Sequence, residues 1–437
     1  MLKRKFMDTL EMWKNTKDKK CLLVKGVRQC GKTFIIREFG KANYENFIEI
    51  NFISKPELKN AFNGNLDVDT MIQGVKLLMG NVNFVPGKTL LFLDEIQDCP
   101  NARTSLKFWA EDNRFDVVAS GSLLGIDYKD IVSIPVGYEI QVDMYPLDFE
   151  EFLWAVGVPS DLIEGMGRHI SGEEVIPDAV HYAMLKRFKE YLAVGGMPDV
   201  VNAYIETKDY QQVQNVQDRI LRDYQDDIAK YANNSDRIKA RNCYMSIPAQ
   251  LSKENHKFQY SVVEKKGTAR KFESSIDWLL EAGMAVASYN VSAPSFPLIA
   301  YKKPDQFRIY LSDIGLFTAM FGFQMKQAIL TDTLEGPAKG GIYESAIADL
   351  LYKAGNKLYY YKREDSTLEI EFLTERDAKV VPVEVKAKKG ASRSLNEILK
   401  RDSISVGYKL TSQNAGVVEK KITLPLYMGM CIAAVKR

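Results

Sequence analysis

A glycine-rich segment, GVRQCGKT at residues 26–33, restricts the possible folds of this chain more than any other part of it. It fits the spacing G-x-x-x-x-G-K-T, after an apolar stretch and before an apolar helical pattern that ends at Gly40. Such glycines let backbone N–H groups turn inward around a phosphate, and the helix N-terminus adds partial positive charge. A chance glycine turn would not explain both flanking elements. The predicted phosphate loop consists of Gly26, Val27, Arg28, Gln29, Cys30, Gly31, Lys32 and Thr33.

In a loop of this kind the lysine brings a positive charge to the β- and γ-phosphates, and the following hydroxyl ligates Mg²⁺. We assign these roles to Lys32 and Thr33. The expected cofactors are therefore ATP and Mg²⁺.

Two adjacent carboxylates, Asp94 and Glu95, end a second apolar stretch, LLFLDE. An aspartate at the end of a buried strand can hold Mg²⁺ through water. A glutamate beside it can take a proton from an attacking water as general base. One carboxylate could merely cap the next helix, but the pair together favours hydrolysis.

Polar residues also surround the apolar run at 117–119. Ser120 or Ser122 is a candidate sensor of the γ-phosphate, and ordinary turn chemistry explains either serine equally well. Arg114 is a candidate arginine finger toward a neighbouring subunit, although most surface arginines have no such role.

Five short apolar stretches, at 21–25, 47–51, 89–93, 116–120 and 139–143, alternate with helical patterns. Near-continuous apolar strands separated by helices predict a parallel sheet that is covered on both faces. The fold class is therefore α/β, with a P-loop nucleotide-hydrolase domain at about 1–150.

The rest of the chain divides into three predicted parts. Residues 151–233 are helical, with apolar residues spaced three and four apart from 213 to 231. Residues 234–330 read as helices followed by a hairpin at 285–291 and 306–311, which describes a winged helix. After a glycine-rich linker at 331–341, residues 342–437 form a further α/β domain.

Composition excludes several classes of protein. The 59 Lys and Arg nearly balance the 57 Asp and Glu, which rules out a basic packaging protein. Three histidines and an odd number of cysteines, five, argue against a histidine metal site and a disulfide framework. No apolar stretch reaches the roughly 18 residues of a membrane helix, and the N-terminus lacks a secretory apolar region. We expect a cytoplasmic protein with no membrane partner.

Six motifs follow one another in the chain: GVRQCGKT, LLFLDEIQD, ASGSLLG, MYPLDFEEFL, YLAVGGMPDVV and YLSDIGL. Together they resemble a prokaryotic family of AAA-type ATP-binding proteins with a C-terminal domain of unassigned function. The resemblance runs over nearly the whole chain. It implies a P-loop core with an additional strand (ASCE type), a winged-helix region and a C-terminal fold like that of restriction endonucleases.

The resemblance also implies a carboxylate site of the PD-(D/E)xK type in the last domain. Glu344, Glu371 and Glu384 map onto its metal ligands, and Lys386 onto the lysine that activates water. Glu384 and Lys386, two residues apart, would share one strand face. Related members usually carry Asp at the position of Glu371. A solvated strand face explains the same residues without any metal.

Four basic residues, Lys265, Lys266, Arg270 and Lys271, cluster at the start of the helix that would enter a DNA major groove. Double-stranded DNA is therefore a candidate partner. A packing or hinge module is the alternative.

These expectations combine into a Mg²⁺-dependent AAA-type ATPase that uses its nucleotide cycle as a switch, with DNA, a protein partner or self-association as its output. Two alternatives stay open. One is a non-hydrolysing nucleotide sensor or scaffold, and the other is a DNA nuclease gated by ATP.

Overall fold

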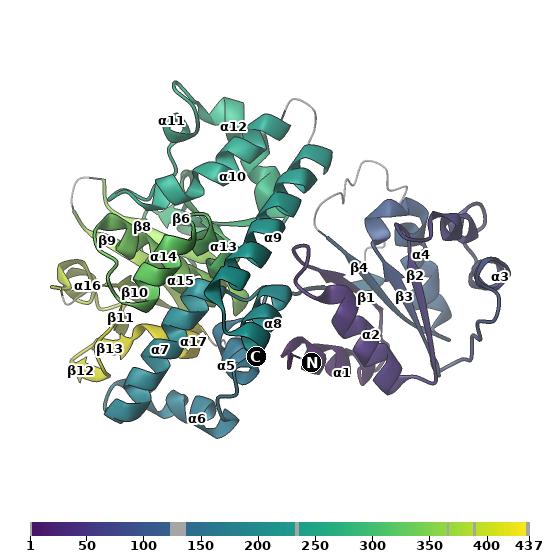
Figure 1. Cartoon of the computed structure of the whole chain (residues 1–437), viewed down its shortest axis with the longest axis horizontal. Coiled ribbons are helices and arrows are strands. Elements are labelled where there is room, and N and C mark those ends of the chain that lie inside the picture. Colours follow the sequence, from purple (N-terminus) through teal and green to yellow (C-terminus); the bar gives the residue numbers. More distant parts are fainter. Residues whose placement is uncertain (1, 123–136, 232–235, 365–366, 388–389, 434–437) are drawn as a thin grey trace. The chain divides into compact units, whose positions relative to one another are not determined.

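The computed structural model describes all of the chain except residues 1, 123–136, 232–235, 365–366, 388–389 and 434–437. The chain forms two compact units, Arg4–Tyr145 and Pro146–Arg437, the second together with Met1–Lys3 (Figure 1). The predicted P-loop domain, at about 1–150, stays a prediction beside the unit Arg4–Tyr145. Among the described residues, no helix has both the length and the apolar character needed to cross a bilayer.

The first unit is built on a five-stranded parallel sheet in the order β2-β3-β4-β1-β5. Its strand β4 lies between β1, which precedes the phosphate loop, and β3, which ends at Asp94. This additional strand confirms the predicted α/β P-loop fold. The strands are β1 (Cys21–Lys25), β2 (Asn46–Asn51), β3 (Thr89–Asp94), β4 (Asp116–Gly121) and β5 (Glu139–Asp143).

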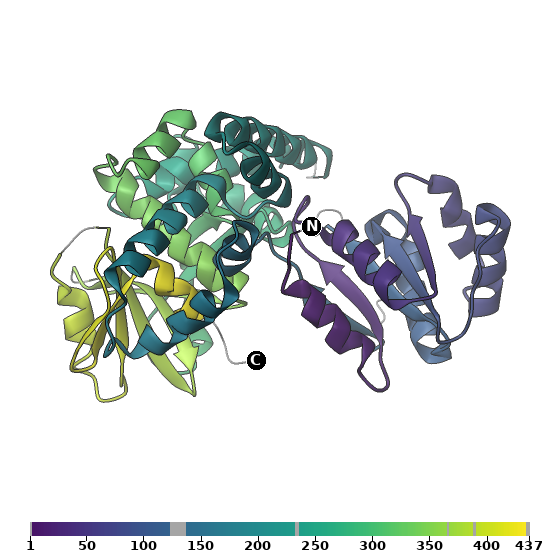
Figure 2. The same cartoon turned by 60° about the horizontal axis from the view of Figure 1, so that its bottom comes forward.

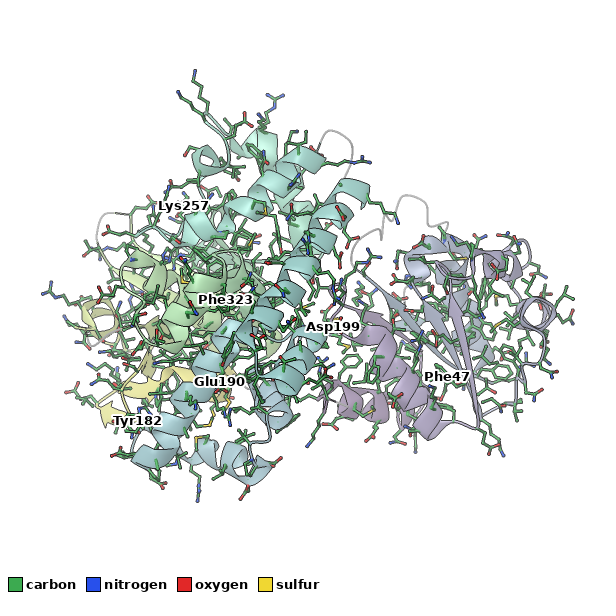
Figure 3. The ribbon with its side chains drawn as sticks, viewed as in Figure 1. Phe47, Tyr182, Glu190, Asp199, Lys257 and Phe323 are labelled. Carbon is green, nitrogen blue, oxygen red and sulfur yellow. The ribbon has the colours of Figure 1, made fainter. Side chains whose placement is uncertain are left out.

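Helices cover both faces of this sheet. Side chains at odd positions of β1 and β3, such as Leu23 and Leu91, pack against Leu106 and Trp109 of α4. Side chains at even positions point the other way, where Phe92 stacks on Phe47 of β2. Figure 3 labels Phe47 in this unit. The helices are α1 (Phe6–Lys14), α2 (Lys32–Asn43), α3 (Val68–Met79) and α4 (Pro100–Asp112), with 3-10 turns η1 (Pro56–Phe62) and η2 (Ile96–Asp98).

The second unit contains an eight-stranded mixed sheet in the order β12-β13-β11-β10-β9-β8-β6-β7. The strands nearest the C-terminus, in yellow-green, form one end of it (Figure 2). The strands are β6 (Ala285–Val291), β7 (Lys302–Leu311), β8 (Leu358–Lys362), β9 (Glu369–Arg376), β10 (Lys379–Val385), β11 (Gly407–Thr411), β12 (Gly416–Val418) and β13 (Lys421–Pro425).

Helices make up the remainder of the second unit, as the sequence predicts for 151–233. They are α5 (Phe149–Ala155), α6 (Ser160–Gly165), α7 (Asp178–Val194), α8 (Pro198–Thr207), α9 (Tyr210–Tyr231), α10 (Arg237–Leu251), α11 (Tyr260–Val263), α12 (Ala269–Glu281), α13 (Ile314–Ala319), α14 (Phe323–Leu330), α15 (Pro337–Lys353), α16 (Arg393–Ile398) and α17 (Gly429–Ala433), with 3-10 turns η4 (Met166–Ser171), η5 (Leu298–Tyr301) and η6 (Leu426–Met428).

The predicted boundary between a winged-helix domain and a C-terminal domain does not separate compact units. The hairpin β6–β7 follows α10, α11 and α12 in winged-helix order, but β6 also pairs in parallel with β8. The hairpin and the C-terminal strands therefore share one sheet. Periodicity within each strand carries no signal for this pairing, which joins Tyr289 to Tyr359.

The predicted linker at 331–341 is partly helical, because α15 already begins at Pro337. Proline is favoured in the first helical turn, where its missing N–H costs nothing. A Cβ on Gly341 would lie 2.1 Å from the backbone oxygen of Leu251, so this glycine allows α15 to approach α10 closely. Of the glycines that suggested a linker, Gly341 thus serves helix packing, whereas a Cβ on Gly336 or Gly340 would meet open space.

Candidate functional site

The phosphate loop joins β1 to α2, as the sequence predicts. Gly26 and Gly31 have φ of 158° and 98°, and a Cβ on Gly26 would lie 2.2 Å from the Met144 oxygen. Lys32 is buried, and its Nζ donates to the backbone oxygens of Gly26 at 2.8 Å and Val27 at 3.1 Å. The lysine charge therefore lies over the loop that is expected to hold the phosphates.

Two contacts hold the middle of the loop in place. Cys30 is fully buried, with its Sγ 3.5 Å from the Met144 oxygen. Arg4 donates to the backbone oxygens of Cys30 at 3.0 Å and Tyr145 at 2.6 Å. Of the other predicted loop residues, Val27 is buried, Arg28 is half-buried, and Gln29 is exposed with a φ of 64°.

Asp94 is the centre of a polar cluster at the carboxyl ends of the strands. It is 2% exposed, and the Thr33 hydroxyl lies 3.0 Å and 3.2 Å from its two carboxylate oxygens. Ser120 donates its hydroxyl to the same carboxylate, and Asn51 Nδ2 donates to Oδ2 at 2.8 Å. Oxygen donors of this kind fit Mg²⁺, which keeps several waters and takes one or two carboxylates.

The structure separates the two candidate sensors. Ser120 at the end of β4 contacts Asp94, which gives it a role in orienting that carboxylate. Ser122 lies just beyond β4 and is 2% exposed.

The sequence analysis missed two residues of this site. Asn51 ends β2 and lies directly opposite Asp94 in the parallel register. Gln97, in η2, donates from Nε2 to Glu95 Oε2 at 2.5 Å, while Glu95 itself has a left-handed backbone with φ of 54°. A polar residue at the end of a neighbouring strand could have identified Asn51, but no sequence signal pointed to Gln97.

Arg114, the candidate arginine finger, lies just before β4, at the edge of the sheet opposite the phosphate loop. Its guanidinium is 2.7 Å from Asp69 and 2.8 Å from Asp112. Two carboxylates thus already hold this arginine on the surface of its own unit.

The basic residues expected to meet DNA lie where the sequence places them. Lys265, Lys266 and Arg270 are exposed before or within the first turn of α12, whereas Lys271 pairs with Glu264 at 2.6 Å. Beyond that turn, the exposed face of α12 is acidic and carries Glu273, Asp277 and Glu281. Such a stripe repels phosphates, so the exposed basic residues of this helix are confined to its first turn and the residues just before it.

The helix glutamate of the expected nuclease-like site, Glu344, is buried and fully engaged. Arg308 Nη1 and His256 Nδ1 each lie 2.7 Å from its carboxylate, and the Tyr310 hydroxyl donates to it as well. Burial alone would raise the pKa of Glu344, but the charges of Arg308 and His256 outweigh it and lower the pKa to about 2.

The two strand carboxylates meet the predicted lysine. Lys386 Nζ is 3.4 Å from Glu371 Oε1 and 3.5 Å from Glu384 Oε1. Burial raises the pKa of Glu371 to about 7, against the charge of Lys386. Among the described residues, no three His, Cys, Asp or Glu side chains are grouped to hold a metal ion. Lys386 and Arg308 thus contact these carboxylates in the structure, Glu384 Oε2 is buried without a hydrogen-bond partner among the described residues, and the implied metal site of Glu344, Glu371 and Glu384 stays a prediction.

The motifs in the second unit meet in a buried ionic cluster. Lys353 Nζ lies 2.8 Å from Asp349 and 3.1 Å from Asp313, and all three side chains are buried. The Tyr191 hydroxyl oxygen lies 2.7 Å from Asp349 Oδ2 and 3.0 Å from the Leu147 oxygen. Residues of MYPLDFEEFL, YLAVGGMP and YLSDIGL therefore stabilise the fold of this unit, and their burial keeps them from a substrate.

Comparison with protein families gives a match that covers most of the first unit. Residues 18–153 match the model of an AAA domain. Residues 185–327 and 339–428 match two domains of unknown function, DUF8612 and DUF4143. The first unit thus has a P-loop NTPase fold and matches the model of an AAA domain, and neither of the other two descriptions assigns a winged helix or a nuclease.

The individual proteins that resemble this chain share low sequence identity with it. An uncharacterized protein of Methanocaldococcus jannaschii is 24% identical over 210 residues, which are 48% of this chain and 41% of that protein. This chain therefore matches about two fifths of its relative's length. Among solved structures, a Walker-type ATPase of Pyrococcus abyssi has a TM-score of 0.43 at 12% identity, over 74% of this chain and 96% of that one.

Two further structures are similar at lower scores. The Orc1 protein of Aeropyrum pernix, in complex with DNA, has a TM-score of 0.28 at 12% identity, over 76% of this chain and 93% of that one. AMPPCP-bound DnaA of Aquifex aeolicus has a TM-score of 0.27 at 15% identity, over 63% of this chain and 85% of that one. Because these scores are low, the fold assignment depends on the strand order of the first unit and on the AAA match.

Proposed function

We propose that this chain is a Mg²⁺-dependent ATPase whose nucleotide cycle acts as a switch. The observation that carries the proposal is the contact between the Thr33 hydroxyl and the Asp94 carboxylate, with Glu95 next in the chain. It brings the hydroxyl of the phosphate loop to the carboxylate at the end of β3. P-loop hydrolases hold Mg²⁺ with this pair of residue types.

Each of these residues has a distinct role in the proposed hydrolysis. Backbone N–H groups of the loop bind the phosphates, and Lys32 exchanges its backbone acceptors for phosphate oxygens. Thr33 and Asp94 would hold Mg²⁺, which when bound neutralises charge on the β- and γ-phosphates.

Glu95 then takes a proton from the water that attacks the γ-phosphorus. As the new P–O bond forms, the bond to the bridging oxygen breaks, and ADP leaves with that oxygen. Glu95 returns its proton to the products or to solvent.

A test compares two variants. Lys32→Ala should lose ATP binding, because the loop loses the positive charge expected at the β- and γ-phosphates. Glu95→Gln should keep ATP binding and lower turnover by about 10²- to 10⁴-fold, because it lacks a general base. A wild type that binds ATP without turnover would favour the sensor or scaffold instead.

The DNA partner has less support than the nucleotide. The acidic face of α12 argues for the packing role of the winged-helix region, whose hairpin shares a sheet with the C-terminal strands. ATP turnover measured with and without double-stranded DNA tests this choice. We expect no stimulation, and a several-fold rise that disappears in Arg270→Glu would establish DNA as a partner.

A further inference from the structure

Within the described part of the chain, Gln97 makes a single side-chain hydrogen bond, and that bond goes to Glu95. Its Nε2 donates to Glu95 Oε2 at 2.5 Å. An ionised carboxylate only accepts hydrogen bonds, so the amide must turn its nitrogen toward Glu95 and its oxygen away. The orientation of the Gln97 amide therefore follows from the charge of its partner.

The oxygen of the Gln97 amide lies beside the last residue of β4, Gly121. Gln97 Oε1 is buried and has no hydrogen-bond partner among the described residues. A Cβ built on Gly121 would lie 2.7 Å from this oxygen. The last residue of β4 thus has no side chain at the point where the amide of Gln97 approaches it.

These two observations argue against a purely structural glutamine. A buried amide oxygen without a partner costs free energy, and folded proteins rarely keep such a group without a reason. The same Gln97 amide that leaves its oxygen without a partner donates a hydrogen bond to Glu95, the carboxylate that the proposed reaction uses as a base. Glu95 also has a left-handed backbone, which L-residues adopt at a cost and which functional sites often contain.

We propose that Gln97 is a positioning residue for hydrolysis that acts through Glu95. The proposal rests on the proposed ATPase function. By holding Oε2, Gln97 fixes the rotamer of the Glu95 carboxylate and leaves Oε1 to take the proton from water. Gly121 provides the space that keeps the Gln97 amide in this place.

The effect should appear in turnover and not in nucleotide binding. Gln97→Ala should lower kcat by about 10- to 100-fold, the usual cost of losing a group that orients a reacting side chain. The KM and the Kd for ATP should change less than about twofold, since Gln97 touches neither the phosphate loop nor Asp94 in any described contact. The matched control is Gln73→Ala, at an exposed position of α3.

Two double variants separate this role from a general loss of structure. In a Glu95→Gln background, Gln97→Ala should have no further effect on turnover, because residues that act as a unit are not additive. Gly121→Ala should lower kcat by displacing the amide, and it should add little in a Gln97→Ala background. Thermal unfolding of each variant checks that it is folded, and Gln97→Ala with Glu95→Gln decides the question should Gly121→Ala not fold.

The outcomes distinguish this inference from the function on which it rests. Wild-type turnover in Glu95→Gln would overturn the proposed role of Glu95 itself. An inactive Glu95→Gln beside a fully active Gln97→Ala would overturn only the positioning role. A rise of kcat in Gln97→Ala would also overturn it, because Gln97 would then restrain Glu95 in an inactive position.

Discussion

Thr33 Oγ1 lies 3.0 Å from Oδ2 and 3.2 Å from Oδ1 of Asp94, although 61 positions separate the two residues in the chain. The contact exists because parallel strands end at the same edge of the sheet. Asn51 and Ser120 reach the same carboxylate from the two strands on either side of β3. The ends of β2, β3 and β4, together with the first turn of α2, therefore contribute to one candidate Mg²⁺ site.

Removing either donor to Asp94 should weaken Mg²⁺ binding. Groups that orient a metal ligand typically contribute about 10- to 100-fold in metal affinity or activity. For Ser120→Ala and Asn51→Ala we expect a rise of this size in the Mg²⁺ concentration that gives half-maximal ATP turnover. A titration of turnover with Mg²⁺ measures it, with Ser54→Ala at an exposed position as control. An unchanged Mg²⁺ requirement in both variants would contradict the site.

Lys326 on α14 should be a source of instability. Its side chain is fully buried, and Nζ has no hydrogen-bond partner among the described residues. Burial lowers its pKa to about 7. Lys326→Met should therefore raise the free energy of unfolding by about 1–3 kcal/mol near neutral pH, as removal of an unpaired buried polar group does. Urea unfolding measures this, with the exposed Lys186→Met as the control.

The gain from Lys326→Met should depend on pH in a definite direction. The folded pKa is about 7, and the unfolded one has the ordinary value of 10.5. Between these values only the unfolded chain binds the proton, so wild-type stability from this group rises with pH. The advantage of the variant should be greatest below pH 7 and shrink toward pH 10. An advantage independent of pH would mean that the lysine is solvated in the folded protein.

Lys353 should be essential to the fold of the second unit. Its ammonium lies between the buried carboxylates of Asp313 and Asp349. Removing one partner of a buried ion pair leaves an uncompensated charge and costs about 3–5 kcal/mol. Urea unfolding followed by circular dichroism should show such a loss in Lys353→Met and little change in the exposed Lys357→Met. Adding Asp349→Asn to Lys353→Met should recover part of the loss, whereas strictly additive losses would contradict the cluster.

Local patterns in the sequence were sufficient for much of the first unit. The structure has β1 and β5 at the predicted residues: β1 is a buried apolar strand, whereas β5 lies at the edge of the sheet and is largely exposed. The phosphate loop was readable for a similar reason, since its glycines, lysine and hydroxyl are consecutive. Asp94 and Glu95 end a continuous apolar run, which also marks them locally.

Strand pairings and side-chain contacts between residues far apart in the sequence could not be predicted from local patterns. The parallel pairing of β6 with β8 merges two predicted domains, and nothing within either strand specifies its neighbour. Arg308, whose partner Glu344 lies 36 residues away, is buried in the second unit and contacts a carboxylate that the resemblance assigns to a metal site. Gln97 was missed because its partner Glu95 has a left-handed backbone that sequence periodicity does not encode.

Glu371 should make the second unit less stable as pH rises. Its folded pKa of about 7 lies above its ordinary value of 4.5. Between these values the folded chain binds a proton that the unfolded chain does not, so the contribution of this group to stability falls with rising pH. Glu371→Gln should therefore gain stability relative to wild type between about pH 5 and pH 8, on the order of 1–3 kcal/mol at the upper end. Equal pH profiles of urea unfolding for both proteins would contradict the buried, protonated carboxyl.

DNA cleavage should be absent from the wild type with either Mg²⁺ or Mn²⁺. A nuclease of the PD-(D/E)xK type needs three carboxylates free to bind metal, which lowers the pKa of bound water and stabilises charge on the phosphate. Here Arg308 and His256 hold Glu344, and Lys386 lies within 3.5 Å of both Glu371 and Glu384. Nicking of supercoiled DNA measures the activity, and a metal-dependent restriction enzyme in the same buffer serves as the positive control.

Two variants decide why cleavage is absent. Glu371→Asp restores the residue that related proteins carry, and it should raise nicking only if the remaining ligands can reach a common metal. Because Glu344 is committed to Arg308, we expect Glu371→Asp to be as inactive as the wild type. Lys386→Ala should also be inactive, since it removes the lysine without freeing Glu344. Nicking by the wild type that Lys386→Ala abolishes would reverse this conclusion, because it would require Glu344 to leave Arg308 and His256 during the reaction.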